Sequence, residues 1–157
     1  MNKVINPEQE HEYILHNSRI SISLGFGLAV LTTDQIFNLS DKSMLVSASF
    51  YLIAALFVIS TSYFLIKSNK FIKQSFSKNA WMGTYHDEFL NSVSLLGYKL
   101  SALVMSLIAL LAMCFGDSLS DIVSLKALGT ALVSLSFLIY GVVTYIKLHQ
   151  DEDEEAP

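Results

Sequence analysis

Long apolar stretches constrain this chain more than any other feature. Residues 44–66 carry no charged side chain, and residues 20–39, 93–115 and 122–146 are nearly as apolar. A helix needs about 20 apolar residues to cross the hydrocarbon core of a bilayer, because it rises about 1.5 Å per residue. A chain of 157 residues is too small to enclose four such helices in a soluble core. We therefore predict an all-α, polytopic membrane protein, a four-helix transmembrane bundle within residues 1–150.

Composition supports the lipid bilayer as the solvent. Hydrophobic residues make up 52% of the chain and charged residues 15%, whereas an average soluble domain has about 25% charged residues. The first apolar stretch does not resemble a signal peptide, because eighteen mostly polar residues precede Arg19, and a signal peptide has a short basic leader. We expect the first span to be retained in the mature protein.

The distribution of basic residues predicts the orientation. An even number of spans places the N-terminus, the segment 67–92 and the C-terminus on one side. That side holds eight of the ten lysines and arginines: Lys3, Arg19, Lys67, Lys70, Lys73, Lys78, Lys99 and Lys147. Because basic residues accumulate in cytoplasmic loops, we expect both termini to be cytoplasmic. We predict a multi-pass protein of a bacterial inner membrane.

Three charged residues fall within the expected spans: Asp34, Lys99 and Lys126. Ionisable groups at membrane depth are candidates for function, but all three lie near span ends, where lysine stems can extend to the interface. Asp34 is shorter, and we expect it to pair with Lys126 or Lys42 near the outer face. An ion-binding or proton-binding role for Asp34 is the alternative. A proton-driven transporter would place its acid nearer the midplane.

Small residues recur along the first two spans. Ser21, Gly25, Ala29 and Thr33 follow one another at intervals of four, and Ser47, Ala54 and Thr61 at intervals of seven. Small residues allow transmembrane helices to approach closely. We expect these stripes to pack the helices of the bundle together, and the alternative is that one stripe forms an oligomer contact or lines a pore.

The segment 67–92 is long enough to hold structure of its own, and we interpret it as a cytoplasmic elbow. Its lysines, Lys67, Lys70, Lys73 and Lys78, alternate with apolar residues, which favours contact with anionic lipid. Thr84 and Asp87 resemble a helix cap, and Trp81 and Tyr85 suit the headgroup region. The same stretch is a candidate docking site for a partner, formed by Trp81, Tyr85, His86, Asp87 and Glu88. Residues 151–157 form an acidic tail that we expect to be disordered.

No pattern predicts catalysis. The chain has one cysteine, no serine stands at an interpretable spacing from a histidine and an acid, and no glycine-rich phosphate loop is present. Glu8, Glu12 and His16 share a helix face and, with His86, could bind a divalent metal, but a solvated helix start explains the acids equally well. We predict no catalytic residue, cofactor or metal. With a net charge of −4, we also expect no direct contact with nucleic acid.

These patterns favour a non-enzymatic membrane subunit. We expect it to be homo-oligomeric and to act as an anchor, sensor or effector for a cytoplasmic protein, as in a bacterial two-component or defence-type system. The alternative is a small homo-oligomeric channel or membrane-permeabilising pore. A membrane enzyme of unknown reaction ranks third.

Overall fold

Four long helices make up nearly all of the chain that the structure describes. This computed structural model describes residues 7–38, 41, 43–75, 85–120 and 123–154. The helices are α1 (Pro7–Phe37), α2 (Met44–Ser75), α4 (Glu88–Ser120) and α5 (Leu125–Glu154), and no strand occurs in these ranges. The all-α class predicted from the sequence is confirmed.

Side-chain caps fix where three of the helices begin. Ser43 accepts a hydrogen bond from the amide of Val46 at the start of α2, and Ser124 accepts one from the amide of Ala127 at the start of α5. Asp87 accepts hydrogen bonds from the amides of Phe89 and Leu90 at the start of α4. These oxygens satisfy backbone donors that have no partner within a helix. The cap expected from Thr84 and Asp87 is therefore made by Asp87, while Thr84 lies outside the described residues.

The end of α1 is set by Asn38. This residue has a φ of 47°, in the left-handed region that asparagine tolerates better than most residues. Its amide donates to the carbonyl of Asp34 at 2.8 Å, which closes the last turn of the helix. The first span therefore ends at Phe37, two residues before the predicted boundary.

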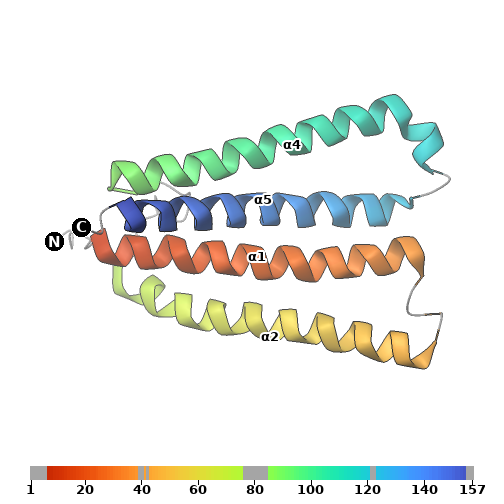
Figure 1. The fold of residues 1–157 in the computed structure, drawn as a ribbon, viewed down its shortest axis with the longest axis horizontal. Coiled ribbons are helices and arrows are strands. Elements are labelled where there is room, and N and C mark those ends of the chain that lie inside the picture. Colours follow the sequence, from red (N-terminus) through yellow and green to blue (C-terminus); the bar gives the residue numbers. More distant parts are fainter. Residues whose placement is uncertain (1–6, 39–40, 42, 76–84, 121–122, 155–157) are drawn as a thin grey trace.

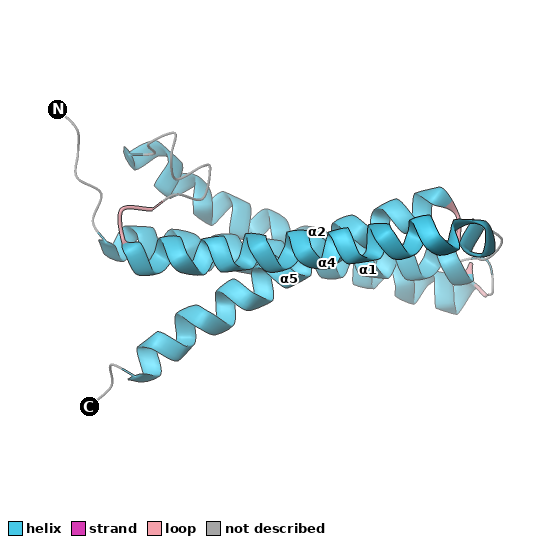
Figure 2. Cartoon of the chain, turned by 90° about the horizontal axis from the view of Figure 1, so that it is seen from above, coloured by secondary structure: helices cyan, strands magenta, loops and turns pink. Residues whose placement is uncertain are grey.

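The helices lie side by side in one row. Figure 1 shows the order α4, α5, α1, α2, and the view turned by 90° in Figure 2 shows the four helices overlapping along much of their length. The most extensive contact joins α1 to α5. In the described part of the chain, α2 packs against α1 only, and α4 packs mainly against α5. The bundle is thus an open layer with two inner and two outer helices.

All four helices are long and apolar enough to cross a membrane. The chain is a multi-pass membrane protein by this criterion. The outer helices carry most of the large apolar side chains that the protein itself leaves uncovered, such as Leu52, Leu56 and Ile59 on α2 and Leu103 and Leu107 on α4. In water these side chains would be costly to expose, whereas lipid tails solvate them.

All four helices extend beyond the predicted spans, α4 from Glu88 to Ser120. α1 runs without interruption from Pro7, as expected for a helix that continues into the first span. α2 continues to Ser75, so the first nine residues of the expected elbow prolong the transmembrane helix instead of turning away from it. α5 continues to Glu154, four residues into the acidic run that we expected to be disordered. In α4 the backbone departs from helical geometry at Phe115, where we predicted the third span to end.

Hydroxyl groups connect each neighbouring pair of helices. Ser134 of α5 donates to the carbonyl of Gly25 in α1 at 2.7 Å, and Ser101 of α4 donates to the carbonyl of Ser136 in α5 at 3.1 Å. Ser23 of α1 donates to the carbonyl of Phe57 in α2 at 3.2 Å. Such bonds stabilise helix pairs in a membrane by about 0.6 kcal/mol on average. The row is therefore held by close approach and hydroxyl contacts as well as by apolar packing.

Candidate functional site

The first candidate site lies at the end of the molecule where α1 begins and α5 ends, which we call the termini end (Figure 1). Here the Glu10 carboxylate, only 4% exposed, accepts hydrogen bonds from the amides of His86 at 3.1 Å and Asp87 at 3.3 Å. The imidazole Nδ1 of His86 lies 3.1 Å from the other carboxylate oxygen. A negative charge is favourable at this position because these amides lie at the positive end of the α4 dipole.

An apolar cluster supports this contact from within the protein. It contains Tyr13, Ile14, Tyr85, Leu90, Val93 and Leu148. Ile14 of α1 and Leu148 of α5 are fully buried. Leu90 and Val93, in the first turns of α4, belong to the same cluster. The cluster and the Glu10 contact together fix the start of α4 against α1.

Tyr85 belongs to this cluster and is not available at the headgroup region, where the sequence placed it. Its side chain is 9% exposed. Burial raises the pKa of the Tyr85 hydroxyl above its ordinary value, and the neighbouring tyrosines Tyr140, Tyr13 and Tyr98 act in the same direction. The hydroxyl therefore stays neutral, which suits an apolar surrounding.

The remaining residues of the predicted docking site differ in their exposure. The side chain of His86 is 72% exposed although its ring contacts Glu10, and Glu88 is exposed beside it. Asp87 is half-buried and caps α4. Trp81 lies outside the described residues. Of the four lysines predicted to lie at the membrane surface, Lys67 is exposed on α2, the side chains of Lys70 and Lys73 are not described, and Lys78 lies outside the described residues.

Glu10 is the residue that the sequence reasoning missed. We had grouped Glu8, Glu12 and His16 because they share a face, but the buried acid lies on the other face of α1. The available signal was its spacing from Ile14 and Ser18, both fully buried. Positions four residues apart lie on one helix face, so Glu10 continues the buried stripe of α1.

No group of three or more histidine, cysteine, aspartate or glutamate side chains that could hold a metal ion occurs in the described ranges. The site considered from Glu8, Glu12, His16 and His86 is therefore not assembled. The contact that the structure does form, between Glu10 and His86, involves two such groups and is occupied by the amides of α4.

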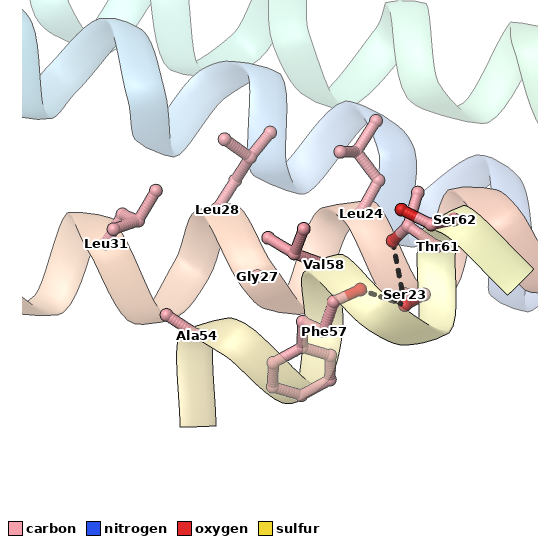
Figure 3. Close-up of a pocket in the computed structure, with 10 residues that line it drawn as sticks. All are labelled: Ser23, Leu24, Gly27, Leu28, Leu31, Ala54, Phe57, Val58, Thr61 and Ser62. Carbon is pink, nitrogen blue, oxygen red and sulfur yellow. Dashed lines mark hydrogen bonds between the residues drawn. The ribbon is translucent and has the colours of Figure 1, made fainter. Parts of the chain in front are cut away.

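A second candidate site lies between α1 and α2. It is a groove of about 300 Å³. Figure 3 shows leucines of α1 on one side of it and residues of α2 on the other. Its polar end is marked by Thr61, which donates to Ser23 Oγ at 3.0 Å. Gly27 allows the two helices to approach, since a Cβ there would stand 3.2 Å from Phe57 Cβ. Apart from these hydroxyls and that of Ser62 the lining is apolar, so the groove suits hydrocarbon.

On the other side of the same helix contact is a second groove, of about 350 Å³. It shares Ser23 and Phe57 with the first groove and adds Arg19, the only arginine of the chain, at its edge. The Arg19 guanidinium lies 6.0 Å from the centre of the Tyr145 ring of α5. This groove therefore combines a cation with apolar walls.

The small-residue stripe of α1 is used within the chain over its first half. Ser21 and Gly25 are buried, and a Cβ on Gly25 would lie 2.7 Å from Leu138 Cγ of α5. Ala29 is half-buried and Thr33 is exposed. Thr33 donates back to the carbonyl of Ala29 in its own helix. The stripe thus serves helix packing near Gly25, and its outer half is open.

The charges predicted at the span ends take different environments. Asp34 is half-buried, and Lys99 and Lys126 are exposed. Lys42, one of the two partners considered for Asp34, lies outside the described residues. The pairing of Asp34 stays a prediction.

Comparison of the chain with protein-family models, with curated proteins and with solved structures found no match.

Proposed function

We propose that this chain is a non-enzymatic membrane subunit that associates with further copies of itself and presents its termini end to a cytoplasmic protein. In this role it acts as an anchor, sensor or effector for that partner. The observation that carries the proposal is the Glu10 contact, which fixes the start of α4 and leaves His86 and Glu88 exposed beside it. A buried carboxylate is costly unless it is hydrogen-bonded. The Glu10 carboxylate accepts hydrogen bonds from the amides of His86 and Asp87 and so holds these residues in place.

The use of the hydroxyl groups supports an anchor over a pore formed by one chain. Ser23, Ser101 and Ser134 each donate to a backbone carbonyl of a neighbouring helix, and Thr61 donates to Ser23. These hydroxyls are therefore used within the chain. A pore would have to form between copies, along the exposed faces of α2 and α4.

Self-association is supported by the open row. Its outer helices leave long apolar faces uncovered by the chain itself, and van der Waals packing between such faces is one source of helix association in membranes. Lipid could cover these faces instead of a second copy. The mass of the complex distinguishes the two cases.

The test has two arms. The purified protein in mild detergent should have the mass of an oligomer, and liposomes containing it alone should not leak ions. An ion flux well above that of empty liposomes would favour the pore instead. A monomeric mass at every detergent concentration would contradict the oligomer.

The partner is tested by cross-linking in native membranes. A photo-reactive group placed at Glu88 should capture one cytoplasmic protein reproducibly. The matched control is the same group at Leu125, which is exposed at the start of α5 on the opposite end of the molecule. Equal capture of the same protein from both positions would contradict docking at the termini end.

A further inference from the structure

The groove beside Arg19 has the two parts of a phospholipid site, a cationic edge and an apolar floor. We propose that it binds one anionic phospholipid, with the phosphate at Arg19 and Lys67 and an acyl chain between α1 and α2. This inference is independent of the proposed function.

The lining of the groove, as far as the structure describes it, contains Arg19 and no carboxylate. Arg19 forms no ion pair within the described part of the chain, and its guanidinium lies 6.0 Å from the centre of the Tyr145 ring. The ammonium group of Lys67 lies 5.2 Å from the centre of the Tyr63 ring. Stacking on an aromatic ring holds a cation in place while leaving its donors open. Both side chains are therefore oriented and able to bind a phosphate.

Lys67 lies outside the groove lining, but both it and Arg19 lie near His16. The charges of Arg19 and Lys67 both act on the imidazole of His16, as does the opposite charge of Glu12. The bond between Ser23 and Thr61 fixes the register of α1 against α2. From that bond Arg19 lies about 6 Å along α1 and Lys67 about 9 Å along α2, in the same direction, at 1.5 Å per residue.

The floor of the groove suits an acyl chain. This apolar part of the groove is lined by Ile22 and Phe26 of α1 and by Phe57 and Phe64 of α2. The rings of Phe26 and Phe57 are stacked with centroids 5.9 Å apart. Ser60 keeps the space between these side chains open. A free phosphate would contact only the cationic edge. Because the apolar floor adjoins that edge in the same groove, a lipid fits the site better.

The depth of the site agrees with this ligand. Residues 20–37 supply about 27 Å of helix beyond Arg19, close to the thickness of a hydrocarbon core. Arg19 therefore falls at the level of the headgroups on the side that we predict to be cytoplasmic, where anionic lipids are recognised by basic pockets between helices.

Retention of lipid through purification tests the proposal. The wild-type protein is reconstituted in vesicles of equal parts phosphatidylglycerol and phosphatidylcholine, extracted, and examined by native mass spectrometry. We expect one phosphatidylglycerol to be retained in preference to phosphatidylcholine. Removing either cation in Arg19→Gln or Lys67→Gln should lower that preference about fivefold. Equal retention of the two lipids by the wild type would overturn the proposal.

Lys99→Gln is the matched control, because Lys99 is exposed on α4, which packs mainly against α5 and away from the groove. It should keep the preference, and a loss equal to that of Arg19→Gln would show general attraction to a basic surface. Inorganic phosphate added to the vesicles should not displace the lipid. Displacement by phosphate would identify a plain anion site and contradict the role of the floor.

A second variant leaves both cations in place. Ser60→Trp fills the groove, so it should abolish retention of phosphatidylglycerol even if Arg19→Gln fails to insert. Size-exclusion chromatography establishes that the variant keeps the oligomeric mass of the wild type. Full retention by a well-folded Ser60→Trp protein would contradict a lipid in this groove.

Discussion

Glu10 is the residue on which the termini end depends most directly. Its carboxylate accepts hydrogen bonds from two backbone amides and contacts the His86 ring. A hydrogen bond to a charged group contributes about 1.5–3 kcal/mol to stability. We expect Glu10→Ala to destabilise the start of α4 by an amount in that range, since the amides of His86 and Asp87 lose their acceptor. Hydrogen exchange of residues 86–91 should become faster, while exchange in the middle of α4 should not change.

Glu12→Ala is the control for this change, because Glu12 is exposed on the same helix. Its effect should be within about 0.5 kcal/mol of zero, as for most surface substitutions. If the two variants exchange alike, the contact of Glu10 does not order α4.

Tyr85 gives the termini end a dependence on alkaline pH. Burial raises the pKa of Tyr85 above the ordinary value of 10.0, so the folded state holds its proton more tightly than the unfolded state. The resulting stability is fully present below pH 10.0 and is lost as the pH rises further. Thermal unfolding in detergent should show this loss in the wild type, and Tyr85→Phe should show less of it. Tyr51→Phe, at a site 62% exposed, should behave like the wild type.

At the scale of the helix, the absence of a side chain at Gly25 allows α1 to pack closely against α5. A methyl group on Gly25 would lie 2.7 Å from Leu138 Cγ and 2.9 Å from the Leu138 backbone nitrogen. Because backbone cannot move aside cheaply, Gly25→Ala should separate the helices and cost about 1–3 kcal/mol. Its melting temperature in detergent should fall accordingly.

Gly129→Ala makes the same chemical change in α5 where a Cβ would meet nothing within 4 Å. It should be neutral, or stabilising by up to about 1 kcal/mol, because alanine favours a helix more than glycine does. Equal losses in the two variants would mean that contact with Leu138 does not determine the result.

The sequence allowed the helices to be predicted but not their neighbours. A span depends on local composition, so residues 44–66 could be assigned without knowing the fold, and α2 does begin at Met44. Which helices touch depends on shape, because lipid is as apolar as the side chains it would replace. Gly25 was recognised as a packing residue, yet nothing in its stripe identified α5 as the partner. Glu10 was missed because its acceptor role needs the backbone of α4, 76 residues away.

At the scale of the whole molecule, the row makes a prediction that a closed bundle does not. Cysteine pairs introduced with Cys114 replaced by serine should cross-link within one chain where helices are neighbours. Ser23→Cys with Thr61→Cys places the pair across α1 and α2, where the hydroxyls lie 3.0 Å apart, and should form a disulfide readily. Ala54→Cys with Leu103→Cys joins α2 to α4, which do not pack together in the described ranges.

The second pair should give no cross-link within a chain, and any disulfide it forms should join two copies. Electrophoresis separates the two products by mass. An efficient intrachain link between residues 54 and 103 would mean that the row closes into a compact bundle in the membrane.

The contact between the first and last helices has a consequence for biosynthesis. The ribosome releases α1 into the bilayer long before α5 exists, yet α5 is the helix against which α1 packs most extensively. Until then the carbonyl of Gly25 lacks the added hydrogen bond from Ser134, which has not been translated. The contact between α1 and α5 therefore forms only after α5 has been translated, and a nascent chain that stops before α5 leaves the α5-facing side of α1 uncovered for membrane quality control to detect.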